Sequence, residues 1–261
     1  LSERKIAEAA LRESERKLLH AQKLESLGMM AGGVAHDFNN QFAVVLGNLE
    51  LALMDLSDDS KARKSINNAI AAANKAAELS RQMLIYTGGA FFTTKDLDLN
   101  EMLNEQINQF METIPSNIKL EVKIDGELPL IQGDGHYIKR AVRNLLINAS
   151  ESIGDNDGKI RVLTGIMDCD ADYLSRSRLE YKPDPGQFVL LEVADSGSGM
   201  DDQTLDRLFD PFFSTKFWGR GLGMAEVIGI VKGHHGAIIV ESEAGKGTMI
   251  RVLFPVVRSA G

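Results

Sequence analysis

Cysteine, aromatic residues and long apolar runs are all scarce in this sequence. Its 261 residues include one cysteine, Cys169, which excludes an internal disulfide and suits a reducing cytosol. Aromatic residues make up 6%, so Leu, Ile, Val, Ala and Met must fill the core. No apolar run approaches the roughly 20 residues of a membrane span, and there is no signal peptide. We therefore expect a cytoplasmic chain without direct membrane contact. It opens without methionine, as a fragment of a longer protein would, and that parent protein could be membrane-anchored.

Positive charge is also in deficit. The chain has 29 Lys and Arg against 37 Asp and Glu, a net charge of −8. This balance argues against a general nucleic-acid binder. An acidic protein can still bind a polyphosphate, but then through local groups and a metal ion. The hydrophobic content of 44% supports a real core in one large domain or two smaller ones.

Residues 1–27 are rich in helix-forming residues. Leu11 and Leu18 lie seven apart, with Ala7 and Ala21 at the complementary heptad positions, which predicts a coiled-coil linker. A single amphipathic helix or a frayed tail is the alternative over so few heptads.

Residues 28–88 read as two long helices. Apolar positions at steps of three, four or seven form one buried stripe per helix. The stripes are Val34, Phe38, Val45, Leu49, Ala52 and Leu56, then Ile66, Ile70, Ala73, Ala77, Ser80 and Leu84. The sequence SDDS (57–60) predicts a turn whose Ser or Asp caps the second helix. The result is an antiparallel hairpin, and because a hairpin buries little alone, we expect a homodimeric four-helix bundle.

The pattern changes after Gly88–Gly89, and residues 89–97 read as a linker. Over 98–257, strand patterns occur at 118–124, 159–166, 187–194, 237–242 and 247–254, with helical patterns near 100–113, 135–153 and 222–234. These predict an α/β domain, a mixed sheet with helices on one face. Residues 168–186, polar and Pro-containing, are expected to form a long surface connection.

The first group of candidate catalytic residues lies in AHDFNN, residues 35–40, which holds a histidine, an aspartate and two asparagines. On a helix, His36 lies about 200° around from both Val34 and Phe38, so it is expected to face solvent. A lone histidine in such a place is usually inert surface.

The helix at 135–153 has a polar face that carries Asn144, Asn148 and Glu151. Asparagine is a mediocre helix former, so two at i, i+4 need a reason. An amide oxygen suits Mg²⁺, although solvated polar positions would give the same pattern.

Two further segments contain glycine beside charge. In VADSGSGM (193–200), Asp195 could accept a hydrogen bond from the exocyclic amine of a ligand, and Gly197 and Gly199 would let the backbone approach a flat ring. An ordinary Asp-Ser-Gly turn is the alternative. FDPFFSTK (209–216) has apolar anchors at Phe209, Phe212 and Phe213, followed by Lys216, whose cation could reach a phosphate.

Glycines also open the last helical segment and follow it. GRGLGM (219–224) places Gly219, Gly221 and Gly223 at a helix start, which makes an anion site or merely a flexible turn. EAGKGT (243–248) is explained by a hairpin turn alone.

Taken in order, the series N-x-x-x-N, D-x-G-x-G, F-D-P-F-F, G-x-G-x-G and G-x-G-T resembles the ATP-binding domain shared by sensor histidine kinases, gyrase and MutL-type ATPases. This resemblance covers about residues 98–257 and implies an α/β sandwich of the Bergerat type. AHDFNN in a helical hairpin is similar to the phospho-acceptor segment of sensor histidine kinases, particularly of hybrid-type kinases that follow a sensory module. No receiver domain is present in the sequence.

The resemblance implies ATP and Mg²⁺ as cofactors and assigns a set of nucleotide-site residues. Asn148 would hold Mg²⁺, and Asp195 would recognise adenine. The full set is Asn144, Asn148, Glu151, Asp195, Gly197, Gly199, Lys216, Gly219, Arg220, Gly221, Leu222, Gly223 and Thr248. Hydrolysing members of the superfamily have a glutamate where this chain has Asn144, so protein phosphorylation is expected rather than free ATP hydrolysis.

The resemblance also implies a phosphorelay. Neutral His36 would attack the γ-phosphoryl group while Asp37 takes a proton from the other ring nitrogen. The phosphoryl group would pass to an aspartate of a response-regulator receiver domain. Asn40, one turn beyond His36, would position water for a regulator phosphatase activity. Asn39 points elsewhere and is given no part.

Three other functions compete with this interpretation. An ATP-binding scaffold or phosphatase-biased protein would bind ATP without transfer, which the full set of binding motifs opposes. A gyrase-like hydrolysing machine is opposed by Asn144 and by the histidine hairpin. A metal enzyme is opposed because His234 and His235 are neighbours and no H-E-x-x-H occurs.

Overall fold

The computed structural model describes residues 38, 40–57, 60–87, 92–215 and 221–257. The chain divides into two compact units, Leu1–Ala90 and Phe91–Gly261. The predicted linker helix at 1–27 lies outside the described residues. None of the helices that are described is long and apolar enough to cross a membrane.

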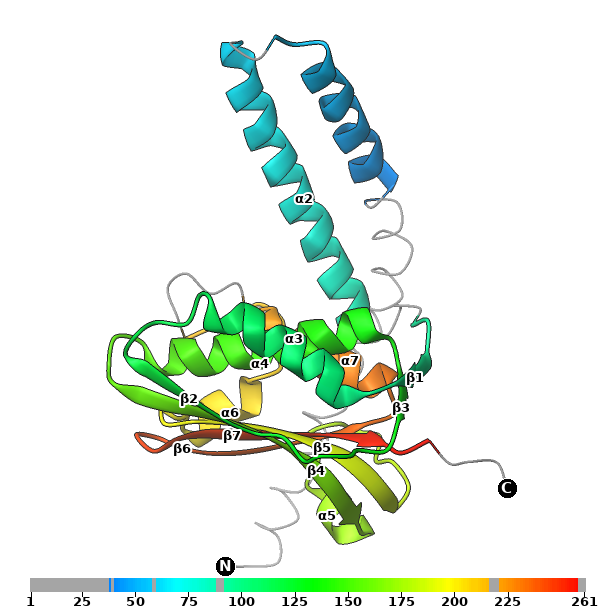
Figure 1. The fold of residues 1–261 in the computed structure, drawn as a ribbon, viewed down its shortest axis with the longest axis vertical. Helices are drawn as coiled ribbons and strands as arrows, with labels where there is room; N and C mark the ends of the chain where they lie inside the picture. Colours follow the sequence, from blue (N-terminus) through cyan, green and yellow to red (C-terminus); the bar gives the residue numbers. More distant parts are fainter. Residues whose placement is uncertain (1–37, 39, 58–59, 88–91, 216–220, 258–261) are drawn as a thin grey trace, which may run out of the picture. The chain divides into compact units, whose positions relative to one another are not determined.

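The first unit contains the predicted helical hairpin. One helix covers residues 40–54, and α2 (Lys61–Thr87) returns beside it, as the blue and cyan ribbons in Figure 1 show. Ser60 caps α2, because its Oγ accepts the amide N–H of Ala62 (3.3 Å). Arg63 Nη1 donates to the carbonyl oxygens of Leu53 (3.0 Å) and Leu56 (2.8 Å), which ties α2 to the end of the first helix.

The predicted stripes of the hairpin are only partly covered within one chain. Residues Leu49 to Leu56 of the first stripe and all six positions of the second are half-buried, whereas Phe38 and Val45 are 53% and 45% exposed. Other apolar side chains of the first helix are exposed more fully: Val44, Leu51 and Met54. A single chain therefore does not bury the whole predicted stripe.

The second unit is built on the predicted mixed sheet, with strand order β2-β4-β5-β7-β6. The strands are β2 (Ile118–Lys123), β4 (Gly158–Cys169), β5 (Gly186–Asp195), β6 (Ala237–Glu243) and β7 (Gly247–Pro255). β2 and β4 are parallel, and the other neighbours are antiparallel. All five strands overlap the predicted segments to within three residues at each end.

Three helices cover one face of this sheet: α3 (Leu99–Met111), α4 (Gly135–Ile153) and α7 (Gly223–Gly233) (Figure 1). The apolar face of α4 is buried at seven positions: Ile138, Ala141, Val142, Leu145, Leu146, Ala149 and Ile153. Alternate residues of the strands, such as Val189, Leu191 and Val193, form the sheet side of this core. Asp134 caps the start of α4 by accepting the amide N–H of His136 (3.1 Å).

Four short elements are absent from the sequence prediction. β1 (Lys95–Leu97) pairs antiparallel with β3 (Ile131–Gly133). α5 (Ala171–Ser175) and α6 (Asp202–Arg207) are capped by Asp170 and Asp201, whose carboxylates accept backbone N–H groups of the first turn. None of the four is long enough to show a periodic pattern.

The opposite face of the sheet is partly covered as well, so the interpretation of residues 168–186 as a surface connection is wrong in part. α5 brings Leu174 onto a small buried cluster with Cys169, Phe188, Ala237, Ile239 and Leu253. Burial is the main cause that raises the pKa of the Cys169 thiol to about 11. The charges of Asp168 and Asp170 contribute to the same rise. Cys169 therefore packs as a small apolar side chain.

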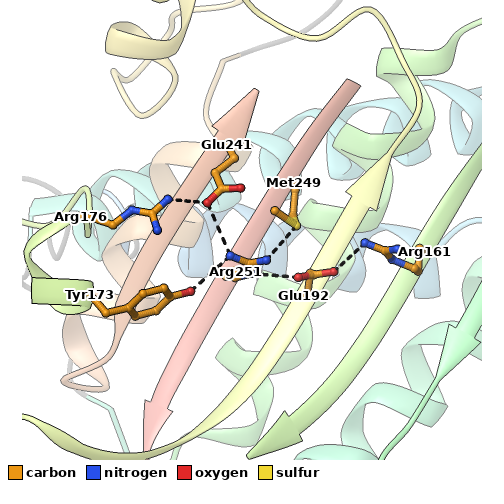
Figure 2. A network of polar contacts seen from close by, with 7 residues as sticks. All are labelled: Arg161, Tyr173, Arg176, Glu192, Glu241, Met249 and Arg251. Carbon is orange, nitrogen blue, oxygen red and sulfur yellow. Dashed lines mark hydrogen bonds and ion pairs between the residues drawn. The ribbon is translucent and has the colours of Figure 1, made fainter. Parts of the chain in front are cut away.

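Beyond this cluster the same face carries a row of alternating charges, shown in Figure 2. Glu192 of β5 is 6% exposed and accepts from Arg161 Nη2 (3.0 Å) and Arg251 Nε (2.8 Å). Arg251 also lies 3.5 Å from Glu241, which pairs in turn with Arg176. The carboxylate of Glu192 is thus a buried acceptor held by two guanidinium groups.

Candidate active site

One face of α4 is polar and faces neither the sheet nor the core. Asn144 and Asn148 are half-buried there, and Glu151 is exposed. Ser152 continues the series one turn beyond Asn148, at the end of the helix. Asn144, Asn148 and Ser152 follow the i, i+4 spacing that puts residues on one helix face, and Glu151 follows Asn148 at i, i+3 on the same face.

The carboxylate of Asp195, at the end of β5, lies against the last turn of α4. Its Oδ1 accepts the hydroxyl of Ser152 (2.7 Å) and the amide N–H of Gly197 (2.8 Å). A Cβ on Gly197 would lie 2.1 Å from Ser152 Oγ, so only glycine allows this approach. Thr248 is paired with Asp195 across β5 and β7, but its buried hydroxyl lies 2.9 Å from that of Ser242.

The start of α7 lies beside the turn that follows α6. Gly221 has φ +62°, and its carbonyl accepts the amide N–H of Phe212 (2.9 Å). A Cβ there would lie 2.4 Å from the carbonyl oxygen of Phe213. Leu222 is 4% exposed, so its side chain belongs to the core, and α7 begins at Gly223. Gly199 lies in the turn after β5 with φ +59°.

The prediction that Phe212 anchors this turn is wrong. Its side chain is 67% exposed and its backbone has φ +64°, because the amide of Phe212 is turned toward Gly221. Phe209 and Phe213 are half-buried, as anchors should be, and Arg207 lies over the Phe213 ring at 4.2 Å.

Comparison with known proteins agrees with this arrangement. Residues 133–258 match the family described as "Histidine kinase-, DNA gyrase B-, and HSP90-like ATPase". The chain is 31% identical over 252 residues to the sensor histidine kinase ZraS of Salmonella typhimurium, covering 94% of this chain and 50% of that protein. This chain contains a sensor histidine kinase catalytic core.

Two solved structures show the fold of this sensor histidine kinase core. Full-length ShkA in complex with AMPPNP is 20% identical, with a TM-score of 0.66 over 89% of this chain and 47% of that chain. The histidine kinase ThkA in complex with the response regulator protein TrrA is 24% identical, with a TM-score of 0.54 over 95% of this chain and 67% of that chain. The first curated relatives are longer, and this chain spans a quarter to a half of their length.

Several predicted site residues of the kinase core lie outside the described residues: His36, Asp37, Lys216, Gly219 and Arg220. Asn40 is described, helical and exposed. The structure brings together Asn144 with Gly223, through α4 and α7, and Asp195 with Gly197, through β5 and its turn.

The donor chemistry of the site fits a Mg²⁺ ion that arrives on a nucleotide. Within the described ranges, no group of three or more His, Cys, Asp or Glu side chains is placed to hold a metal ion. Asn148 offers a neutral amide oxygen on the polar face of α4. Mg²⁺ commonly takes one or two protein oxygens and completes its coordination with phosphates and water.

Sequence reasoning missed two charged residues in the kinase core, Arg140 of α4 and Glu226 of α7. Glu226 is 1% exposed, and its Oε1 accepts from Arg140 Nε (2.6 Å) and Nη2 (2.5 Å). Its Oε2 accepts from Asn144 Nδ2 (2.9 Å). A single charge in the apolar run MAEVIGIV was the available signal, since a buried charge requires a partner.

Proposed function

We propose that this chain transfers the γ-phosphoryl group of ATP to His36 and then to an aspartate of a response-regulator receiver domain. The main support for this proposal is a set of hydrogen bonds. Ser152, at the end of the polar face of α4, donates to Asp195, and Asn144 on the same face donates to the carbonyl of Gly223 at the start of α7. These are the places where the ATP-binding motifs of the family fall. In the sequence, AHDFNN leads directly into the first helix of the hairpin, as expected of a phospho-acceptor segment.

The transfer step is a displacement at phosphorus. A ring nitrogen of neutral His36 forms the new N–P bond as the bond between the γ-phosphorus and the β–γ bridging oxygen breaks, leaving ADP. An ordinary histidine pKa of about 6.5 leaves most imidazole neutral at pH 7. Asp37 accepts the proton of the other ring nitrogen and orients the ring.

The chain's own groups hold the nucleotide. Asp195 accepts from the adenine amine, and Gly197 and Gly199 line that pocket. Lys216 and residues 219–223, which directly precede and open α7 in the sequence, would bind the phosphates, because the start of a helix favours anions. Asn148 would hold Mg²⁺, which would supply the charge neutralisation that phosphoryl transfer needs.

The partners follow from the same proposal. The complex of ThkA with TrrA supports a response-regulator partner, because ThkA shares this fold. Residues 1–27 would connect the hairpin to an upstream sensory module. Two hairpins would pair as a homodimer, and nucleic acid is not a partner.

Labelling with [γ-³²P]ATP tests the kinase activity. The wild-type chain should gain an acid-labile label, the signature of a phosphoramidate, and His36→Gln should gain none while still binding ATP. Asn148→Ala should lose nucleotide binding itself. Normal labelling of the His36 variant would refute the acceptor assignment, and ATP binding without any wild-type label would favour the scaffold function.

A regulator phosphatase activity is proposed for Asn40, which is exposed on the first helix of the hairpin. Its amide would align water against the acyl phosphate of the regulator. Asn40→Ala should remove this dephosphorylation and leave His36 labelling unchanged. The measurement is the decay of ³²P-labelled receiver domain with each variant, and equal decay rates would exclude this role.

A further inference from the structure

The contact between α4 and α7 contains a buried carboxylate that the proposed reaction does not use. Glu226 is the fourth residue of α7, and its neighbours in that helix are apolar. It reaches across to α4, where Arg140 and Asn144 lie one turn apart. Burying a carboxylate is costly unless it is paired and hydrogen-bonded, and here both conditions are met by α4.

The chemistry of this contact fixes the orientation of the Asn144 amide. A carboxylate only accepts hydrogen bonds, so the group of Asn144 that faces Glu226 must be its NH₂. The carbonyl oxygen of Gly223 is a second acceptor on the same side, 3.4 Å from Nδ2. The amide oxygen of Asn144 is therefore the group turned away from Glu226, and it lies 3.8 Å from the point a Cβ on Gly223 would occupy.

We propose that Glu226, held by Arg140, is a positioning residue: it presents the Asn144 amide oxygen to the Mg²⁺ side of the bound nucleotide. This inference rests on the proposed nucleotide site. An amide oxygen facing phosphates alone would be repelled, whereas one facing Mg²⁺ or its water is attracted. Without Glu226 the amide can turn over, and its NH₂ then faces the cation.

A different role for Glu226 would be that of a water-activating base, in place of the glutamate that position 144 lacks. The geometry opposes this role. Oε1 is occupied by two nitrogens of Arg140, Oε2 accepts from Asn144, and the side chain is 1% exposed. A carboxylate whose two oxygens are both engaged by donors is poorly placed to take a proton from water.

Glu226→Gln tests the positioning role because the shape is kept and the charge is lost. Glutamine presents either its NH₂ to Arg140 or its NH₂ to Asn144, so one donor faces another in both orientations. Calorimetry of the full chain with AMPPNP, with and without Mg²⁺, measures the gain in affinity that Mg²⁺ gives. In the variant this gain should be smaller by about 10- to 100-fold, because removing the hydrogen bonds that support a metal ligand typically weakens metal binding by that factor. The variant's Mg²⁺-free affinity should stay within about 2-fold of the wild type, well below that loss.

Glu192→Gln is the matched control. Glu192 is also buried and also held by two guanidinium contacts, from Arg161 and Arg251, on the other face of the sheet (Figure 2). Its variant should keep the wild-type gain from Mg²⁺. An equal loss in both variants would overturn the proposal, because general destabilisation would then account for the effect.

A double variant shows whether Glu226 acts through Asn144. In an Asn144→Ala background, Glu226→Gln should have no further effect on the gain from Mg²⁺, since the amide it orients is gone. If Glu226→Gln fails to fold, Arg140→Lys tests the same contact with a milder change and should lower the gain. A wild-type chain that does not bind AMPPNP would refute the proposed function. A wild-type gain that Glu226→Gln leaves intact would refute the positioning role alone.

Discussion

His234 is 3% exposed, and both of its ring nitrogens are used. Nε2 accepts the backbone N–H of Asp134 (2.9 Å), so the proton is on Nδ1, which donates to the carbonyl of Ile230 (2.7 Å). The ring also packs against Phe92 and Phe254. Burial lowers the pKa of His234, outweighing the bond to Ile230 and the charge of Asp134, which both raise it. The folded chain therefore prefers the neutral ring.

This preference predicts acid sensitivity of the second unit. The unfolded chain protonates His234 below its ordinary pKa of about 6.5 and the folded chain does so only at lower pH. The contribution of His234 to stability is thus complete above pH 6.5 and is lost as the pH falls below it. Thermal unfolding at pH 7.5 and 5.5 measures this slope, which should be shallower in His234→Gln. His136→Gln, a change at an exposed histidine in the first turn of α4, should keep the wild-type slope. Equal slopes for wild type and His234→Gln would exclude the effect.

At the residue scale, the sequence pattern located the groups of the site but not their partners. Asn144, Asn148 and Asp195 stand out because polar residues interrupt strong apolar patterns. Ser152 could have been found too, since it follows Asn148 by four residues on the same helix face. The pairing of Arg140 with Glu226 joins residues 86 apart in sequence, so it depends on how α4 packs against α7. No local pattern encodes that packing.

Among the elements, length decided what could be predicted. α4 begins and ends where its wide apolar face does, between the caps Asp134 and Gly154. β4 to β7 were found because each is at least seven residues long and rich in branched apolar residues. β1 and β3 have three residues each and pair across more than 30 residues of chain, so neither shows alternation and their pairing depends on tertiary contacts.

The prediction for the segment between β4 and β5 was wrong for a different reason. Its composition is polar, yet Leu174 and Leu179 are 1% and 5% exposed. A few buried side chains are enough to hold a short helix such as α5 against a sheet, and they do not change the mean hydropathy of the segment. The composition of this segment therefore predicted its exposed side chains correctly but gave no sign of the few that pack against the sheet.

At the scale of the whole molecule, the first helix of the hairpin keeps an apolar seam. Val44, Leu51 and Met54 follow one another at steps of seven and three, the spacing of one coiled-coil seam. They are 62%, 62% and 80% exposed. Single exposed apolar residues are ordinary, but a regular seam along one helix marks an interaction surface. A second hairpin placed by two-fold symmetry would cover Leu51 and Met54, the part of the seam farthest along the helix from Asn40, and this is the homodimer we propose.

Leu51→Asp tests this dimer. In a two-fold symmetric pair the change occurs twice, and each buried leucine contributes about 1.5–3 kcal/mol. The dissociation constant should therefore rise by roughly 100-fold or more. Sedimentation equilibrium over a range of chain concentrations measures it. Met111→Asp is the matched control, because Met111 is 59% exposed on α3 of the other unit and should leave the dimer intact. A Leu51→Asp chain that still dimerises as tightly as the wild type would place the interface elsewhere, since a buried aspartate at the seam could not be accommodated without that cost.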